Sequence, residues 1–450
     1  MTKINRIFIA NRGEIAVRII RTARALGIET VLGVSQADRD SLGAQLADRA
    51  VVLGPAPSMQ SYLKVGTVIE AAKGTGCDAI HPGYGFLSEN RALAQACAEN
   101  DLIFIGPSPD NLAAVGDKLT ARTHAEAAQV PLVPGGTAET PEDAARIADA
   151  IGFPLLIKAV AGGGGKGMKR VDRREDLASQ LDLAMSEAAN SFGDDRVYIE
   201  RYVTTGRHVE VQILSDGDTI LHAGERDCSV QRRYQKVVEE APAPGLSDQF
   251  RAEIHAAAIA FARHISYRSL GTVEFLVDVE RNAFYFLEMN ARVQVEHPVT
   301  EAISGLDLIA LQIRIAEGTP LPMTQADIHL HGHAIECRLN AEDPDRDFAP
   351  SPGRVTLAWF PPLPGLRVDT HMQSGAMIPP FYDSMVAKLI THGPTRTEAI
   401  ATMQAALRCH SLTGITTNAG LHARIMADDT FRQGGVDTTY LPTLLAKDAS

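Results

Sequence analysis

Alternating apolar and polar stretches at the start of the chain predict a strand, a helix and a second strand. Residues 6–10 are apolar, residues 14–26 repeat their apolar positions at helical spacing, and residues 30–34 are apolar again. Gly27 is placed to cap the helix. The first turn of this βαβ unit, residues 10–13, lacks the GxGxxG pattern of a dinucleotide-binding fold. A nicotinamide site is therefore not expected here.

A hairpin is predicted further along the chain. Residues 272–279 and 283–289 are rich in β-branched and aromatic side chains, and the three residues between them supply a turn. With Arg281 at the centre of the turn, Glu274 lies opposite Glu288. Two directly opposed carboxylates share a face of the sheet and repel each other unless a cation lies between them. A divalent metal is one natural solution.

Polar residues continue at every second position beyond this hairpin. They are Asn290, Arg292, Gln294 and Glu296, and Pro298 is expected to end the extended run. In an extended chain they would form one continuous polar face. The pattern alone favours an ordinary strand with one solvated side.

A glycine-rich loop lies in a second predicted unit. Residues 154–160 form a buried strand, the loop AGGGGKGM follows, and a strand begins at Lys169. The loop runs from strand to strand and Lys166 precedes a glycine, so it is not a Walker A loop. Four successive glycines leave backbone amides free to cradle phosphate oxygens. Flanked by Lys158 and Lys166, the loop is interpreted as a flexible phosphate-binding lid rather than a plain hairpin.

Two further segments carry candidate chemistry. Residues 225–240 concentrate Arg226, Arg232, Arg233 and Lys236, which suggests an anion site or, equally, a surface network with Glu225, Glu239 and Glu240. Residues 81–86 form a loop after a short strand, where open α/β sheets bind ligands. A simple turn would explain that loop as well.

Composition narrows these alternatives. A chain of 450 residues is expected to form two or three compact units. Its net charge of −12 argues against a nucleic-acid or membrane-surface binder, so an anionic ligand needs a local basic cluster. There is no signal-peptide core and no apolar stretch of about 18 residues. The five cysteines are widely spaced and form no CxxC pair, which predicts that the protein is located in the reducing cytoplasm.

Together the lid, the paired carboxylates, the basic cluster and the carboxylate beyond them predict an ATP-using ligase. Mg²⁺ suits such a site because it takes one or two carboxylates plus phosphates. The sequence also resembles the biotin carboxylases of the ATP-grasp superfamily, essentially from end to end. The blocks that carry the resemblance are IANRGEIAVRIIR (residues 9–21), HPGYGFLSEN (81–90), GGGGKGM (162–168), RDCSVQRRYQKVVEEAPAP (226–244) and EMNARVQVEHPVTE (288–301).

The resemblance implies an α/β chain with the ATP-grasp fold. Residues 1–115 would form a Rossmann-like N-terminal domain and residues 116–131 a linker. Residues 132–204 would form a small subdomain carrying the glycine lid. Residues 205–450 would form a large mixed α+β part, comprising the ATP-grasp core and the C-terminal domain.

The resemblance also implies roles for individual residues. Magnesium or manganese would be held by Glu274, Glu288 and Asn290, and bicarbonate by Arg292, Gln294 and Val295. Glu296 would be the base, Lys236 would steady carboxyphosphate, and Arg338 would stabilise the biotin enolate beside Tyr84 and Gly85. ATP would be bound by Lys118, Lys158, Gly163, Gly164, Gly165, Gly167, Met168, Glu200, Arg201, Val203, His208, Gln231, Tyr234, Leu276 and Glu288. Many members have His at position 234, Lys at 201 and Gly at 161, where this chain has Tyr, Arg and Ala.

The implied reaction is ATP-dependent carboxylation of biotin by bicarbonate. The Ala-Met-Lys-Met motif that carries biotin is absent, so biotin is expected on a separate carrier protein. The chain most resembles the free-standing subunit of bacterial acetyl-CoA carboxylase, working with carboxyltransferase subunits. A homodimer is expected, with Arg21 and Arg367 near the interface.

Several alternatives stay open on the sequence alone. The chain could serve another acyl-CoA, pyruvate or 2-oxo-acid carboxylase, or it could be an ATP-grasp ligase acting on an amine or carbamate. A non-catalytic binding or regulatory paralogue is a further alternative. The presence of Lys236, Arg292, Glu296 and Arg338 argues against it.

Overall fold

The N-terminal part is built on a parallel sheet. The computed structural model describes residues 3–159, 168–193 and 195–448. Five parallel strands have the order β3-β2-β1-β4-β5, with bounds β1 Arg6–Ile9, β2 Glu29–Ser35, β3 Arg49–Gly54, β4 Ala79–His81 and β5 Ile103–Phe104. The helices of this part are α1 Gly13–Ala25, α2 Leu42–Leu46, α3 Val65–Gly74 and α4 Arg91–Glu99. The predicted βαβ unit is confirmed.

A pair of helices then leads to a small antiparallel sheet. The two helices are separated at Asp117, whose extended backbone lies between α5 (Pro109–Gly116) and α6 (Lys118–Ala127) and whose side chain caps α6. The sheet has the order β6-β9-β7-β8. Its elements are β6 Gly135–Ala138, α7 Pro141–Ile151, β7 Leu155–Ala159, β8 Met168–Val171, α8 Leu177–Phe192 and β9 Val197–Arg201.

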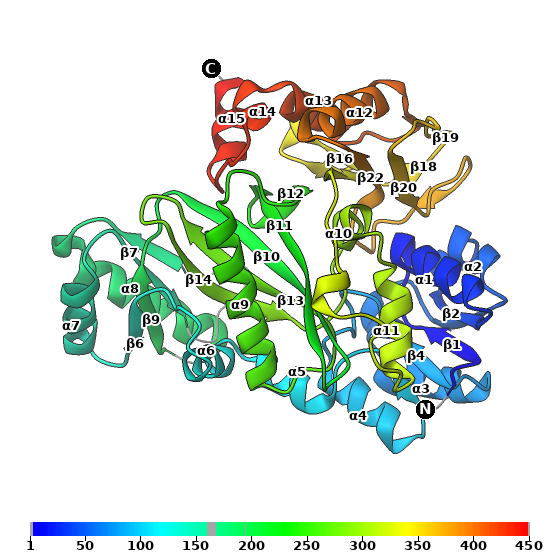
Figure 1. Cartoon of the computed structure of the whole chain (residues 1–450), viewed down its shortest axis with the longest axis horizontal. Coiled ribbons are helices and arrows are strands. Elements are labelled where there is room, and N and C mark those ends of the chain that lie inside the picture. The colour runs from blue at the N-terminus through cyan, green and yellow to red at the C-terminus, as the bar shows by residue number, and fades with distance from the viewer. Residues whose placement is uncertain (1–2, 160–167, 194, 449–450) are drawn as a thin grey trace.

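The largest unit is an eight-stranded antiparallel sheet that lies centrally in Figure 1. Its order is β14-β13-β10-β11-β12-β15-β22-β20. The strands are β10 Gly206–Ser215, β11 Ile220–Arg232, β12 Gln235–Ala241, β13 Ser269–Asp278, β14 Ala283–Asn290, β15 His333–Asn340, β20 Leu366–Thr370 and β22 Met385–Gly393. It therefore joins the middle of the chain to its last quarter.

Helices and short strands complete this unit. The helices are α9 Asp248–His264, α10 His297–Ser304, α11 Leu308–Ala316, α12 Arg396–Cys409, α13 Ala419–Ala427, α14 Asp429–Gln433 and α15 Tyr440–Asp448. The short strands are β16 Glu342–Asp343, β17 Ala349–Pro350, β18 Gly353–Arg354, β19 Leu357–Trp359, β21 Met377–Ile378 and β23 Ser411–Thr413. Helix α9 packs Phe261 against Phe286 of the sheet, with ring centroids 4.6 Å apart. The predicted mixed α/β architecture is confirmed. Within the described ranges, no helix is both long and apolar enough to cross a bilayer.

The hairpin β13–β14 brings the predicted carboxylate pair together, although not by the predicted route. Near the turn Asp278 pairs with Ala283 and Phe275 with Phe286, so the turn centre lies between Glu280 and Arg281. Continued unchanged, this register would place Leu287 opposite Glu274. The register shifts between Glu274 and Phe275, and Glu274 pairs with Glu288 instead. A one-residue bulge at Leu287 therefore shifts the register by one residue and brings Glu288 opposite Glu274, whereas the prediction ascribes this pairing to a turn centred on Arg281.

The predicted extended run beyond the hairpin is wrong. Strand β14 ends at Asn290, the chain turns, and α10 begins at His297 with Glu296 at its N-cap. Pro298 lies in the first turn of that helix rather than ending a strand. Proline is favoured there because the first helical N–H groups need no partner within the helix. The polar residues of this segment therefore converge by a turn and not by strand alternation.

Candidate active site

A cavity of about 1470 Å³ gathers the predicted site residues. It lies where the three sheets meet, and it is lined by all of the described residues to which the family resemblance gives a role in binding or catalysis. They are Tyr84, Gly85, Lys118, Lys158, Met168, Glu200, Arg201, Val203, His208, Gln231, Tyr234, Lys236, Glu274, Leu276, Glu288, Asn290, Arg292, Gln294, Val295, Glu296 and Arg338. The predicted lid residues Gly163, Gly164, Gly165 and Gly167 lie outside the described residues.

Three carboxylates form a row across neighbouring strands on the cavity side of the large sheet. Glu210 of β10 is directly opposite Glu274 of β13, and Glu274 is opposite Glu288 of β14. The Lys236 ammonium lies 2.6 Å from Glu210 and 2.9 Å from Glu274. Burial lowers the pKa of Lys236, but the surrounding carboxylates raise it more, so the pKa ends well above its usual value. Lys236 therefore stays charged and holds the row together.

Arg226 is the second cation behind this row. It is fully buried on β11, directly opposite Glu210, and its Nε donates to that carboxylate at 2.6 Å. Its two terminal nitrogens donate to four further buried oxygens, those of Gln212, Thr272, Gln294 and Thr300. A buried guanidinium is tolerated when all of its donors have partners. Arg226 thus connects the sheet with the turn that precedes α10.

The basic segment 225–240 is neither the single anion site nor the surface network that its composition suggested. Successive residues of a strand point to opposite faces, so the charges separate into different clusters. Glu225 pairs with Arg251 and His255, and Glu240 pairs with Arg396 and His333. Arg232 and Arg233 both reach Asp347. Of the four predicted basic residues, Lys236 lines the cavity, Arg226 lies behind it, and Arg233 is at its rim.

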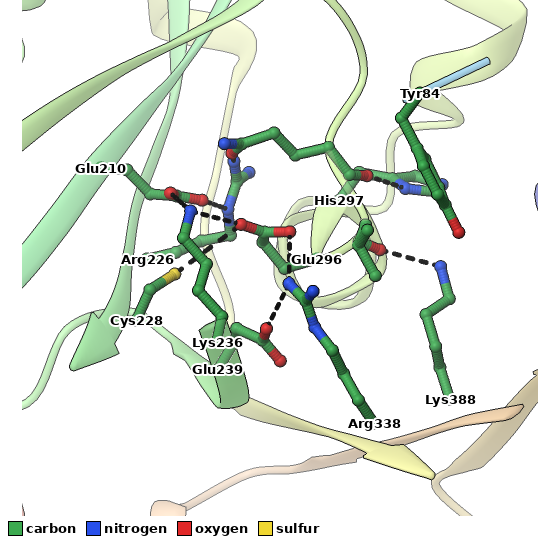
Figure 2. Close-up of polar contacts among 12 residues, drawn as sticks. Tyr84, Glu210, Arg226, Cys228, Lys236, Glu239, Glu296, His297, Arg338 and Lys388 are labelled. Atoms are coloured by element: carbon green, nitrogen blue, oxygen red, sulfur yellow. Dashed lines mark hydrogen bonds and ion pairs between the residues drawn. The ribbon is translucent and has the colours of Figure 1, made fainter. Parts of the chain in front are cut away.

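Glu296 lies between two cations at the start of α10, as Figure 2 shows. One of its oxygens accepts from Lys236 at 2.7 Å and the other accepts from Arg338 at 2.9 Å. Burial alone would raise the pKa of Glu296, but Lys236, Arg338 and Arg226 outweigh it and hold the pKa far below its ordinary value. In this arrangement Glu296 is ionised and is a weak base.

Glu239 is a buried carboxylate that sequence reasoning assigned only to a surface network. It lies on β12, with Oε1 2.5 Å from Arg338 Nη2 (Figure 2). Burial, reinforced by repulsion from Glu296, raises the pKa of Glu239 to about 7 despite the opposing effect of Arg338. Arg338 is therefore shared between an ionised carboxylate and one that titrates near neutrality.

The predicted metal ligands surround one end of the carboxylate row. Glu274 accepts from Asn290 and Gln294 at 2.7 Å each and pairs with His208 at 2.7 Å. Among the described residues, the cation paired with Glu288 is Lys118, at 3.9 Å. Burial and repulsion from Glu274 raise the pKa of Glu288. Glu288 is therefore short of positive charge, although Glu274 beside it already contacts Lys236 and His208, and the oxygen donors of Glu274, Glu288 and Asn290 fit a hard divalent cation.

The opposite end of the cavity has an apolar wall and basic residues beside it. Val203, Leu276 and Tyr285 pack together there. Lys158 forms an ion pair with Glu200. The His208 ring, hydrogen-bonded to Gln231 at 2.9 Å, leads from this wall to the carboxylate row. A flat apolar ligand with an anionic tail would match this sequence of surfaces.

The N-terminal part supplies the third side of the cavity. The Tyr84 hydroxyl donates to Glu14 of α1, and Glu89 pairs with Arg292 at 3.1 Å. Arg292 also donates to Asn290 at 2.8 Å. Sequence reasoning missed Glu14, which lies in the block of residues 9–21, and it missed Glu210. No signal in the sequence gives the role of Glu210, which depends on the pairing of β10 with β13.

Comparison with known proteins assigns the fold and the family. Three family-wide sequence models match in order: biotin carboxylase N-terminal domain (residues 3–112), carbamoyl-phosphate synthase L chain ATP-binding domain (117–324) and biotin carboxylase C-terminal domain (336–443). Biotin carboxylase 1 of Bacillus subtilis is 49% identical over 444 residues, which cover 98% of each chain.

Two solved structures are also similar over the whole length. A biotin carboxylase complex from Campylobacter jejuni has a TM-score of 0.92 and 43% identity, covering 98% of this chain and 99% of that one. The biotin carboxylase domain of 2-oxoglutarate carboxylase from Hydrogenobacter thermophilus, crystallised as a dimer with MgADP and bicarbonate, has a TM-score of 0.91 and 41% identity, covering 98% of each chain.

The three sheets around one polar cavity, with these similarities, define an ATP-grasp ligase. The chain belongs to the biotin carboxylase family. It is an enzyme that carboxylates biotin at the expense of ATP.

Removing the buried cation Arg226 should destabilise the fold. Arg226→Met leaves the buried Glu210 without one of its two cations at 2.6 Å, so the free energy of unfolding should fall by about 3–5 kcal/mol. Adding Glu210→Gln should recover part of this loss. Arg281→Met, at a partly exposed pair with Asp278, should cost less than about 1 kcal/mol. Urea unfolding of wild type, the two single variants and the double variant measures these changes in the free energy of unfolding. Equal losses in Arg226→Met and Arg281→Met would contradict the prediction.

Titration of Glu239 should make the fold less stable as the pH rises. A glutamate in an unfolded chain titrates near pH ~4.3, whereas Glu239 in the fold has a pKa of about 7. The stability from this group is therefore present below pH ~4.5 and is lost as the pH rises through 7. Relative to wild type, Glu239→Gln should gain stability between pH 5 and pH 8. The measurement is the free energy of unfolding of wild type and Glu239→Gln at pH 5 and at pH 8, with the exposed Glu280→Gln as control. A stability difference between wild type and Glu239→Gln that is the same at both pH values would contradict the prediction.

Proposed function

We propose that the chain catalyses the first half-reaction of acetyl-CoA carboxylase, carboxylating biotin on a separate carrier protein. The observation that carries the proposal is the arrangement of Glu296 between Lys236 and Arg338 in a cavity that also holds the paired carboxylates. Full-length similarity to free-standing biotin carboxylases supports it.

ATP would lie across the cavity with its base against Val203 and Leu276 and its phosphates toward Lys118 and Lys158. The other predicted nucleotide contacts that the structure describes line the same cavity. Glu274, Glu288 and Asn290 would hold Mg²⁺ or Mn²⁺, which neutralises phosphate charge when bound. On Glu274 the metal would replace a cation that now contacts the carboxylate, Lys236 or His208.

Bicarbonate would be held by Arg292, by Gln294 and by the backbone amide of Val295, close to Glu296. Glu296 would remove its proton so that a bicarbonate oxygen attacks the γ-phosphate, forming carboxyphosphate and ADP. A carboxylate paired with two cations is a weak base. Substrates that draw Lys236 and Arg338 toward their own negative charge would raise the pKa of Glu296 and make it competent.

Carboxyphosphate would then release CO₂ and phosphate, with Lys236 steadying the phosphate oxygens. The phosphate would take the ureido proton of biotin, and the ureido nitrogen would attack CO₂. Arg338 would stabilise the enolate of the deprotonated biotin ring, beside Tyr84 and Gly85. Fixed cations in a cavity closed to water stabilise such charges and protect an intermediate that hydrolyses readily.

The partners follow from the same assignment. The carrier would enter beside Tyr84, and carboxyltransferase subunits would take the carboxyl group onward. A homodimer would use the surface groove of Arg18, Glu301, Asp307 and Arg367, where Arg18 and Arg367 share Glu301. The dimeric structure of the related Hydrogenobacter domain supports this. Five free thiols support a cytoplasmic location.

The assignment of Glu296 is tested by ATP hydrolysis with bicarbonate, with and without free biotin. Wild type should hydrolyse ATP in a bicarbonate-dependent way and respond to biotin. Glu296→Gln should lower the rate by roughly 10²–10⁴-fold because it cannot accept a proton, whereas Glu280→Gln, in the exposed hairpin turn, should match wild type. An unaffected Glu296→Gln would remove Glu296 as the base, and lack of biotin stimulation in wild type would contradict the reaction.

The final acceptor is tested by transfer from the carboxylated carrier. The chain, its organism's biotinylated carrier and its carboxyltransferase should form malonyl-CoA from acetyl-CoA, bicarbonate and ATP. Propionyl-CoA, which carries one more methylene, should react at least about tenfold more slowly, and so should pyruvate and 2-oxoglutarate, which lack the coenzyme A group. Faster carboxylation of pyruvate or 2-oxoglutarate would assign the chain to the corresponding carboxylase instead.

A further inference from the structure

Lys388 is a fully buried cation directly behind the proposed bicarbonate site. It lies on β22 with no exposed side-chain surface, and it does not line the cavity. Its ammonium is 3.0 Å from the Glu14 carboxylate and donates to the Val295 carbonyl oxygen at 2.8 Å. Figure 2 shows Lys388 reaching toward this turn beside Tyr84. Strand β22 and helix α1 therefore meet at the backbone of the active-site turn.

Burial of this lysine requires a reason beyond packing. Burial lowers the pKa of Lys388, yet Glu14, Glu336 and Asp369 together raise it above its usual value. A buried ammonium loses its hydration and is rarely kept unless its donors are used. An apolar side chain of similar length could fill the same volume in a well-packed core. An apolar side chain could not, however, donate the hydrogen bond that Lys388 gives to the Val295 carbonyl oxygen.

The position of that carbonyl matters because of the peptide it belongs to. The Val295 C=O is part of the peptide that joins Val295 to Glu296. Under the proposed function, Val295 donates its amide to bicarbonate and Glu296 removes the proton. A hydrogen bond to the joining peptide fixes how the donor and the base are oriented toward each other. The other side of the turn is held by His297, whose Nδ1 lies 2.8 Å from the Gln294 carbonyl oxygen.

The same ion pair reaches the proposed biotin pocket. The Glu14 oxygen that faces Lys388 also accepts from the Tyr84 hydroxyl. Glu14 comes from α1 of the N-terminal part, Lys388 comes from β22 of the large sheet, and Val295 comes from the turn between β14 and α10. One buried charge pair thus sets the relative positions of the bicarbonate side and the biotin side.

We propose that Lys388, paired with Glu14, is a positioning residue for bicarbonate: it fixes the Val295–Glu296 peptide so that the substrate and its base are aligned. The inference rests on the proposed function, in which bicarbonate binds at Val295. A purely structural role for the ion pair is the competing explanation.

Steady-state kinetics of Lys388→Met distinguish the two. A hydrogen bond from a charged donor is worth a factor of roughly 10 to 100, so kcat/KM for bicarbonate should fall at least about tenfold. The KM for ATP should change less than about twofold, because the nucleotide end of the cavity does not touch Lys388. The matched control is Arg396→Met, which removes a cation from Glu240 in the same part of the fold. It should lower the melting temperature and leave the KM for bicarbonate unchanged.

The double variant Glu14→Gln/Lys388→Met separates stability from positioning. It leaves no unpaired charge at this ion pair, so its melting temperature should return toward that of wild type, and it can be assayed even if Lys388→Met fails to fold. Its kcat/KM for bicarbonate should remain at least about tenfold low, because the Val295 carbonyl still lacks its donor.

Two results would overturn the inference in different ways. If wild type responds to bicarbonate and biotin but the double variant regains both stability and bicarbonate kinetics, the ion pair is structural and the inference alone fails. If wild type shows no bicarbonate-dependent ATP hydrolysis, the proposed function is wrong, and the role proposed for Lys388, which rests on it, is wrong as well.

Discussion

The active-site half of the molecule depends on how a row of buried carboxylates is neutralised. Glu210, Glu274 and Glu288 occupy opposed positions on three adjacent strands, an arrangement that is unfavourable without positive charge. Arg226 and Lys236 provide that charge from the next two strands, β11 and β12. The Lys236 ammonium also contacts Glu296. The cation that neutralises the carboxylate row therefore also lowers the pKa of the proposed base. Any anionic substrate that attracts these cations changes both at once.

The cavity is complete only when distant parts of the chain are in place. The carboxylates of Glu274 and Glu288 come from β13 and β14, Arg338 comes from β15, and Tyr84 with Glu14 comes from the N-terminal unit. Lys388, more than 370 residues after Glu14 in the sequence, closes the arrangement. Binding of ATP, bicarbonate and biotin is therefore coupled to the correct docking of the sheets, and local order in one unit is not sufficient for activity.

Sequence reasoning predicted what depends on short spacing and missed what depends on long-range pairing. The N-terminal βαβ unit, the strand before the glycine-rich loop and the β13–β14 hairpin follow from apolar periodicity and turn residues, and many of the cavity residues lie within motifs that the sequence displays. Glu210 and Lys388 could not be placed, because their roles arise from the neighbours of β10 and β22 in the large sheet. The sequence predicts an extended run beyond Asn290 because alternation of polar residues does not distinguish a strand from a turn that buries polar and apolar side chains alike.

The bulge at Leu287 separates the hairpin turn from the carboxylates it connects. On the cavity side of the bulge, Glu274 pairs with Glu288, Val273 with Met289 and Thr272 with Asn290, and these three pairs hold the register of β14 on β13. At the far end, the four-residue turn of residues 279–282 includes the half-exposed Val279. The length of that turn is consequently not what aligns Glu274 with Glu288. The turn is a natural insertion point, where a peptide tag or a fluorescent dye could be attached while the pairing of Glu274 with Glu288 is kept.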